Sequence, residues 1–244
     1  MQQSKRITVV TVCRNAETEL EETILSVITQ TYHNIEYIII DGASTDSSIE
    51  IINKYRDRIS VFVSEPDNGI FDAMNKGINL ASGEWINFMN AGDRFVSESI
   101  IEKMANHNFA ENVGVVYGET LNDKGTFYMI PFHKNRSKLK PMGICHQSIF
   151  VRADLAKRYM FDTSFKIAAD YRQIMTIYNE GYKLFDLKLE VSYFAPGGLS
   201  SKKRIKQLKE VAMICDATSS FVYYWSLLKI IIKNILQWAL NREL

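Results

Sequence analysis

Short apolar runs alternate with stretches of helical periodicity along the first hundred residues. Four of these runs predict buried strands: Ile7–Val12, Ile35–Ile40, Ile59–Ser64 and Trp85–Met89. The segments between them have apolar side chains three and four residues apart and predict helices: residues 17–30, Ser47–Tyr55 and Ile70–Leu80. Strands that alternate with helices imply βαβ crossovers. We therefore expect an α/β fold with a mostly parallel central sheet flanked by helices.

The second half of the chain has a looser pattern. It predicts, in chain order, a helix, a strand, a shorter strand, a polar loop, a helix, two short strands and a basic helix. These elements are expected over Ser97–Ala105, Val113–Tyr117, Thr126–Pro131, His133–Met142, Asp170–Glu180, the surroundings of Leu184 and Val191, and Ser201–Thr218.

The segment Phe221–Leu240 is apolar at fifteen of its twenty positions, which is long enough to span a bilayer. Five polar residues nevertheless lie along one helical stripe: Ser226, Lys229, Lys233, Gln237 and, just beyond the segment, Asn241. The segment therefore predicts an amphipathic helix, with Tyr and Trp side chains as anchors at a membrane surface. The alternative is a helix that packs on its own domain or on a partner subunit, which leaves a homodimer open.

Composition narrows the class of protein. Hydrophobic residues make up 46% and charged residues 23%, which excludes a disordered, collagen-like or multi-span membrane chain. The net charge of +1 gives no argument for nucleic acid, although residues 1–121 are acidic and residues 122–244 basic. The three cysteines (Cys13, Cys145, Cys215) show no zinc or disulfide spacing. Together with an N-terminus that lacks a signal-peptide core, they indicate a cytoplasmic protein.

Polar residues follow each of the four first strands. These strand ends are Thr11–Asn15, Asp41–Asp46, Ser64–Gly69 and Asn90–Asp93. Ligands of open parallel sheets bind outside the carboxyl ends of the strands, so we expect these residues to meet at one edge. Acidic groups gathered there repel one another unless a cation or strong donors offset the charge. A divalent metal with a polar ligand would do so, whereas any single Asp could be a cap or turn residue.

Four segments carry a family resemblance. They are Val-Val-Thr-Val-Cys-Arg-Asn, Ile-Ile-Ile-Asp-Gly-Ala-Ser-Thr-Asp, Asp-Asn-Gly-Ile-Phe-Asp-Ala-Met-Asn-Lys-Gly and Gly-Glu-Trp-Ile-Asn-Phe-Met-Asn-Ala-Gly-Asp, which begin at residues 9, 38, 67 and 83. In this order and spacing they resemble the nucleotide-sugar domain of family 2 glycosyltransferases, which have the GT-A fold. The resemblance implies a GT-A domain over 1–200, with a nucleotide-sugar half (5–95), an acceptor half (96–200) and C-terminal helices over 201–244.

The resemblance also implies roles for the strand ends. The positions that would bind the nucleotide sugar are Thr11, Arg14, Asn15, Asp41, Ser44, Asp67, Gly69, Asn75, Asn90 and Ala91. Asp41 would accept the N–H of the base, typically uracil, because an ionised acceptor makes a strong and selective hydrogen bond. Many relatives have Arg at the position of Met74, which leaves the identity of the base open.

The metal motif of the family, Asp-x-Asp, is altered in this chain. The aligned residues are Asn90, Gly92 and Asp93, so Asp93 is the anionic ligand expected for Mn²⁺ or Mg²⁺. Asn90 would supply a neutral amide oxygen or bind the sugar. Substrate phosphates and water can complete the coordination of such a metal. A degenerate, inactive domain is the alternative.

The acceptor half would supply the catalytic base. In Ile167-Ala168-Ala169-Asp170-Tyr171, Asp170 lies at the position of the family's catalytic carboxylate; the alternative is a plain helix N-cap. His146 and Gln147 would bind acceptor or sugar hydroxyls, although a hydrogen-bonded structural His is an equal alternative. Ser200 and Lys202 lie in a loop that would close over the diphosphate or face anionic lipid instead.

The reaction implied is an inverting, metal-assisted transfer of a sugar from a UDP-type donor to an acceptor hydroxyl. A lipid-linked saccharide in polysaccharide biosynthesis is the expected acceptor, with a peripheral location on the inner face of a membrane. Two alternatives remain open. One is a non-catalytic domain that binds sugar nucleotides or serves as a scaffold, and the other is a nucleotidylyltransferase. A dehydrogenase is disfavoured because no G-x-G-x-x-G follows the first strand.

Overall fold

The computed structural model describes residues 4–122, 125, 145–194, 203–216 and 218–240. These residues form one eight-stranded sheet in the order β3-β2-β1-β4-β7-β6-β8-β5. The strands are β1 (Ile7–Cys13), β2 (Ile35–Asp41), β3 (Val61–Ser64), β4 (Trp85–Phe88), β5 (Arg94–Phe95), β6 (Val113–Leu121), β7 (Ile149–Arg152) and β8 (Lys183–Tyr193). Strands β1 to β4 pair in parallel, and β7 is antiparallel to both of its neighbours.

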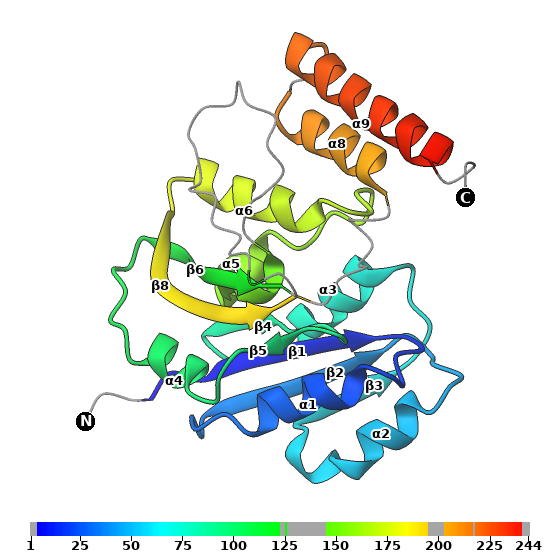
Figure 1. Cartoon of the computed structure of the whole chain (residues 1–244). Coiled ribbons are helices and arrows are strands. Elements are labelled where there is room, and N and C mark those ends of the chain that lie inside the picture. The colour runs from blue at the N-terminus through cyan, green and yellow to red at the C-terminus, as the bar shows by residue number, and fades with distance from the viewer. Residues whose placement is uncertain (1–3, 123–124, 126–144, 195–202, 217, 241–244) are drawn as a thin grey trace.

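Helices cover both faces of this sheet (Figure 1). They are α1 (Leu20–Ile28), α2 (Ser48–Lys54), α3 (Ile70–Leu80), α4 (Ile100–Ala105), α5 (Ala153–Arg158), α6 (Ala169–Asn179), α8 (Arg204–Ile214) and α9 (Phe221–Leu240), with the 3₁₀ turns η1 (Arg56–Arg58) and η2 (His146–Ser148). Helices α1, α2 and α4 contribute to the core on one face. Helices α3, α5 and α6 contribute to the core on the other. The sheet is therefore buried on both sides, as its continuous apolar strands require.

The predicted elements of the first half are confirmed, with small changes at their ends. Helix α1 begins at Leu20 and not at residue 17, because residue 17 is tied into a loop contact: Glu17 N–H donates to Asp46 Oδ2 (3.1 Å). Strand β3 begins at Val61, because Ile59 N–H still closes the preceding 3₁₀ turn onto Arg56. Each helix between these strands buries one face against the sheet, and this spaces its apolar residues three and four positions apart. The spacing therefore predicts the helices.

The prediction of two short strands near Leu184 and Val191 is wrong. A single strand, β8, runs from Lys183 to Tyr193 and pairs with β6 through shifts of register. Lys188 has a left-handed backbone (φ 56°), and its N–H donates to Asp186 Oδ1. This bulge interrupts the apolar pattern without ending the strand. The predicted strand Thr126–Pro131 and the loop His133–Met142 lie outside the described residues.

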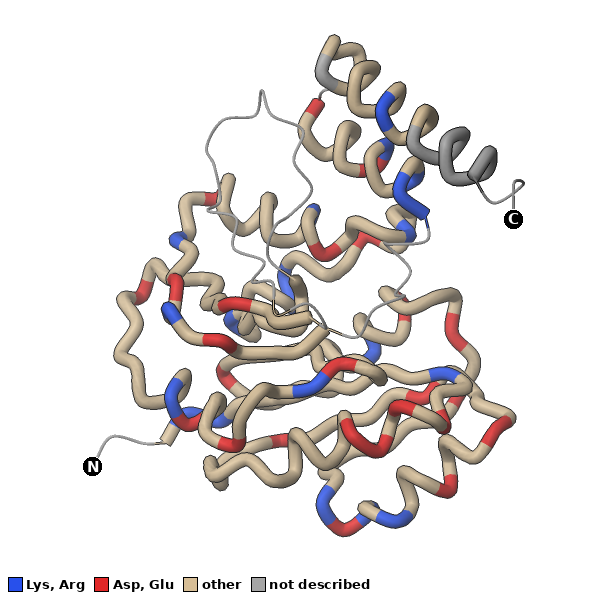
Figure 2. Tube along the Cα trace, viewed as in Figure 1, with Lys and Arg blue, Asp and Glu red and all other residues tan. Residues whose placement is uncertain are grey.

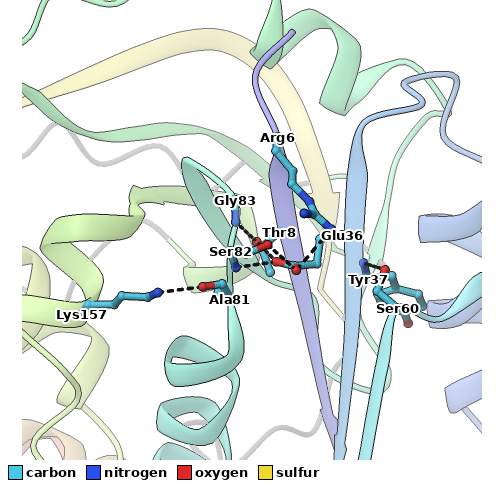
Figure 3. A network of polar contacts seen from close by, with 9 residues as sticks. All are labelled: Arg6, Thr8, Glu36, Tyr37, Ser60, Ala81, Ser82, Gly83 and Lys157. Atoms are coloured by element: carbon cyan, nitrogen blue, oxygen red, sulfur yellow. Dashed lines mark hydrogen bonds and ion pairs between the residues drawn. The ribbon is translucent and has the colours of Figure 1, made fainter. Parts of the chain in front are cut away.

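A buried carboxylate holds the edge of the sheet where β1 and β2 begin (Figure 3). Glu36 accepts hydrogen bonds from Thr8 Oγ1 (2.7 Å), Ser82 N (2.6 Å) and Ser82 Oγ (2.6 Å). Arg6 lies 3.4 Å away in an ion pair. The network fixes the loop between α3 and β4. It lies five residues, or roughly 16 Å, from the carboxyl end of β2.

The C-terminal helices pack beside the start of α6 (Figure 1). Val211 and Ala212 of α8 are buried against Ala168, with Tyr223 of α9 packed at the same cluster. Basic residues gather on α8 and acidic residues around α1 and α2, so the charge imbalance of the sequence is also spatial (Figure 2). Among the described residues, no helix is long and apolar enough to cross a membrane.

Candidate active site

The carboxyl ends of the four parallel strands lie at one edge of the sheet. Cys13 is in register with Asp41, which is in register with Ser64. Beyond the strands, Gly42 N–H donates to Cys13 O (2.9 Å), and Ala91 N–H donates to Val12 O (3.2 Å). The predicted loops are therefore neighbours, as the rule for ligand sites of open sheets requires.

Asp41 is fully buried at this edge and is surrounded by donors. Its carboxylate accepts hydrogen bonds from the Ser44 N–H (2.9 Å), the Ser44 hydroxyl and the Ser64 hydroxyl (2.7 Å). The Cys13 thiol lies 3.6 Å from it. Burial, and then the adjacent Asp41 charge, raise the pKa of that thiol far above its usual range. A base N–H would therefore meet Asp41 by taking the place of a serine hydroxyl, and the predicted base contact stays a prediction.

The loops after β1 and β2 are tied to each other. Asn15 has a left-handed backbone (φ 50°), which turns its N–H toward Ser44 Oγ (2.8 Å). Its side-chain oxygen accepts the N–H of Thr45 (2.8 Å). Arg14 is exposed, and its Cδ lies 3.3 Å from the position that a Cβ on Gly42 would occupy. Ser44 thus links Asp41 to the loop that presents the Arg14 guanidinium.

The loop after β3 brings a second carboxylate, that of Asp67, against Gly42, the residue after Asp41. A Cβ on Gly42 would lie 2.2 Å from Asp67 Oδ2, so the Asp67 side chain occupies the space that a side chain at position 42 would fill. Its other oxygen accepts the N–H of Gly69 (2.8 Å). Gly69 has φ 116°, a conformation that strains other residues. This glycine therefore allows the chain to fold back onto Asp67.

Two of the predicted nucleotide contacts have protein partners instead. Thr11 is fully buried, and its hydroxyl donates to Met89 O (2.7 Å). The Asn75 amide binds the backbone of Phe161 twice, with its Nδ2 donating to the carbonyl and its Oδ1 accepting the N–H (2.9 Å each). These hydrogen bonds tie Thr11 to the backbone of Met89 and Asn75 to the backbone of Phe161. Direct binding of the nucleotide by either side chain stays a prediction.

The turn after β4 is joined to the 3₁₀ turn η2. Asn90 Nδ2 lies 2.9 Å from His146 Nε2, and Gln147 Nε2 donates to Asp93 Oδ1 (3.2 Å). Asn87, which the sequence analysis did not select, holds η2 in place by donating to Gln147 O and Ile149 O (3.0 and 2.9 Å). The metal motif and the predicted acceptor residues, 54 positions apart, therefore lie side by side.

Asp170 approaches the same place from α6. His146 Nδ1 lies 3.6 Å from Asp170 Oδ2, while Asp170 Oδ1 accepts the N–H of Tyr171 (2.8 Å). Asp170 is not the N-cap, which is Ala168. Burial lowers the pKa of His146, but the hydrogen bond and charge of Asp170, with a smaller effect of Asp93, outweigh it and raise that pKa above its ordinary value. A neutral imidazole with its proton on Nδ1 would donate to Asp170 and accept from Asn90.

The residues around Asp93 fit a hard divalent cation. Asn90 Oδ1 and Gln147 Oε1 are buried and have no hydrogen-bond partner among the described residues. Oxygen atoms of this kind, with one carboxylate, are the ligands that Mn²⁺ and Mg²⁺ accept when phosphates and water complete the shell. No three His, Cys, Asp or Glu side chains of the described residues converge as a metal site. Any cation would therefore depend on these amide oxygens and on the substrate.

Two predicted residues, Ser200 and Lys202, lie outside the described residues. One residue near Asp170 was missed by the sequence analysis. Glu210 of α8 accepts hydrogen bonds from the backbone just before α6. No local pattern could have indicated it, because its partners lie more than forty positions earlier in the chain.

Comparison with solved structures identifies the fold. A mannosyltransferase, PcManGT from Pyrobaculum calidifontis, solved with GDP-Man and Mn²⁺, superposes with a TM-score of 0.69 at 19% identity, covering 93% of this chain and 73% of that one. TarS 1–349 of S. aureus, solved with UDP-GlcNAc, gives 0.67 at 17% identity, covering 86% and 66%. The fold predicted from the sequence, GT-A, is thereby confirmed.

Sequence comparison then gives the family. The model of glycosyl transferase family 2 matches residues 8–182, and the chain belongs to this family. An uncharacterized glycosyltransferase of Haemophilus influenzae is 38% identical over 107 residues, which are 43% of this chain and 42% of that protein. A PGL/p-HBAD biosynthesis glycosyltransferase of Mycobacterium bovis is 31% identical over 135 residues (53% and 52%). The matches thus span about half the length of these relatives. An uncharacterized glycosyltransferase of Mycobacterium tuberculosis matches more fully, at 30% identity over 182 residues (72% and 70%).

Proposed function

We propose that this chain transfers a sugar from a nucleoside diphosphate sugar, of the UDP type, to an acceptor hydroxyl. The observation that carries the proposal is the contact of Asp170 with His146, which itself contacts Asn90 of the metal motif. A candidate base thus lies beside the residues expected to hold the diphosphate. Family membership and two fold neighbours solved with sugar nucleotides support the same reaction.

The proposed chemistry is a single displacement with inversion. Asp170 takes the proton of the acceptor hydroxyl as that oxygen attacks the anomeric carbon. The bond from this carbon to the phosphate oxygen breaks, and its electron pair leaves with the nucleoside diphosphate. His146 would orient Asp170 through the contact of its Nδ1 with Asp170 Oδ2 (3.6 Å). Asp93, Asn90 and Gln147 would hold a divalent cation, which when bound offsets the charge of the leaving diphosphate.

A matched pair of variants tests the base. Asp170 and Asp154 both occupy the second position of a helix, in α6 and α5 respectively. Asp154 is exposed and forms an ion pair with Arg152. Asp170→Asn should lower the rate of sugar-dependent UDP release by about 100-fold or more, with unchanged affinity for UDP. Asp154→Asn should leave both unchanged.

The assay uses UDP-, GDP- and dTDP-sugars with Mn²⁺, and repeats with excess EDTA. Equal turnover of wild type and Asp170→Asn would remove Asp170 from the role of base. Full activity in EDTA would contradict the assignment of a cation to Asp93. Binding of sugar nucleotides without transfer to any saccharide acceptor would favour the non-catalytic alternative.

We further propose that the acceptor is lipid-linked and that α9 lies on an anionic membrane surface. The exposed apolar side chains of this helix recur at helical spacing: Phe221, Tyr224, Trp225, Leu228, Ile231 and Ile232. Such a stripe is costly in water and typical of interfacial helices. Exposed basic residues stand nearby on the same helix pair: Lys203, Arg204, Lys206, Lys209 and Lys229. The charge of these residues suits anionic headgroups.

Vesicle sedimentation tests this surface. The wild type should sediment with vesicles that contain anionic phosphatidylglycerol and less with purely zwitterionic vesicles. A double variant, Trp225→Ser with Leu228→Ser, should lose this binding while keeping its melting temperature. Unchanged sedimentation of the double variant would contradict the assignment, and dimerisation lost in that variant would favour a second copy of the chain.

A further inference from the structure

The backbone that leads into α6 is held by a residue from a distant helix. Glu210 of α8 is 6% exposed. Its Oε1 accepts the N–H of Lys166 (3.0 Å), and its Oε2 accepts those of Ile167 (2.8 Å) and Ala168 (2.9 Å). One carboxylate thus satisfies three consecutive backbone groups.

The sequence of α6 explains why such a partner is needed. The first N–H groups of a helix have no partner within the helix. The N-cap of α6 is Ala168, whose methyl group cannot accept a hydrogen bond. A negative charge at this end of a helix also interacts favourably with the helix dipole. Of these groups Glu210 binds the N–H of the N-cap residue Ala168, and its other two bonds hold the residues just before the helix.

The segment that Glu210 binds, residues 166–168, ends two residues before Asp170. The backbone from Lys166 to Ala168 is fixed by Glu210, and the next turn carries the carboxylate toward His146. Apolar contacts close the same joint, because Ala168 packs on Val211 and Ala212 of α8. The hydrogen bonds of Glu210 and the apolar packing of Ala168 therefore both fix the backbone that carries Asp170.

We propose that Glu210 is a positioning residue, which holds Asp170 in place for proton transfer by fixing the backbone that leads into α6. The inference rests on the proposed glycosyl transfer. The three hydrogen bonds of Glu210 all go to the segment just before Asp170. Loss of Glu210 should therefore affect the chemical step more than binding of the donor. Small misplacements of a catalytic group can cost about 100-fold in rate.

The chain offers a matched control in Glu36 (Figure 3). This carboxylate is also buried and also accepts three hydrogen bonds, but it lies at the opposite edge of the sheet. Glu210→Ala should lower kcat by about 10- to 100-fold, with the KM for the donor within threefold of wild type. Glu36→Ala should lower the melting temperature and leave kcat per folded protein within threefold. Glu210→Gln keeps one acceptor oxygen and should recover part of the lost kcat.

Hydrogen–deuterium exchange gives a readout that does not depend on activity. Amides of residues 166–173 should exchange at least tenfold faster in Glu210→Ala than in wild type or Glu36→Ala. Unchanged kcat in folded Glu210→Ala, or unchanged exchange, would overturn the proposal. If Glu210→Ala does not fold, a wild-type kcat in Glu210→Gln overturns it equally. A wild type that transfers no sugar refutes the proposed function, and exchange then decides separately whether Glu210 holds the segment.

Discussion

A methyl group added at position 42 should damage the nucleotide end of the site without unfolding the protein. In Gly42→Ala the new Cβ would lie 2.2 Å from Asp67 Oδ2, and ordinary contact begins near 3.4 Å. The oxygen must therefore retreat by about 1.2 Å. Asp67 is held in place by the N–H of Gly69 at 2.8 Å, so a retreat of this size strains or breaks that bond.

The magnitude follows from the bond that is lost. A hydrogen bond to a charged group contributes about 1.5–3 kcal/mol. If the loop has to be reordered when the nucleotide binds, the same free energy is subtracted from binding. This corresponds to a dissociation constant raised by about 10- to 150-fold. The loop is exposed, so the melting temperature should change little.

Gly77→Ala is the matched control. Its Cβ would lie 2.5 Å from Val10 Cγ1 in the buried contact between α3 and β1. Overpacking of a core typically costs about 1–3 kcal/mol, so this variant should lose stability and keep its affinity. Isothermal titration with UDP and with GDP measures affinity, and circular dichroism measures melting. Unchanged affinity in Gly42→Ala, or an equal loss of affinity in both variants, would refute the reasoning.

Three further predictions concern the frame of the site. Asn75→Ala should unbind both backbone groups of Phe161 and lower the free energy of unfolding by about 1–3 kcal/mol; urea titration checks this, and an unchanged midpoint speaks against it. Burial raises the pKa of Glu36, but its hydrogen bonds outweigh burial and lower it overall. Its contribution to stability is therefore present above the unfolded pKa and lost as the pH falls through the folded pKa, so wild type should lose more stability than Glu36→Gln between neutral and acidic pH. Burial, and then nearby carboxylates, raise the pKa of Cys13 far above its usual range and that of Cys145 to about 11. Both thiols should react with a thiol reagent at neutral pH only after unfolding, which peptide mapping can show.

The first half of the fold could be predicted because its signals are local. Each strand from β1 to β4 is a buried run, and each crossover helix buries one face. The carboxyl ends of such strands must meet, so the sequence predicts that Asp41, Asp67 and Asp93 lie at one edge. Physical rules about parallel sheets carried that inference.

The second half could not be predicted in the same way. Strand β7 has four residues, too few for a period, and it pairs with β4 although β5 and β6 lie between the two strands in the chain. The contact of His146 with Asp170 and the hydrogen bonds of Glu210 depend on how η2, α6 and α8 pack against one another. Side chains whose partners lie twenty to forty positions away leave no local signature, and these include the ones closest to the proposed chemistry.

The position of β7 also has a consequence for biosynthesis. Strand β4 pairs on one side with β1 and on the other with β7, so its outer edge stays unpaired until residues 149–152 have been made. At about 5–20 residues per second, the 64 residues that follow Phe88, up to Arg152, take roughly 3 to 13 seconds to make. During this interval a nascent chain would present an open β-edge to its surroundings. The strand ends proposed to bind the nucleotide are thus complete in sequence well before Glu210 is made.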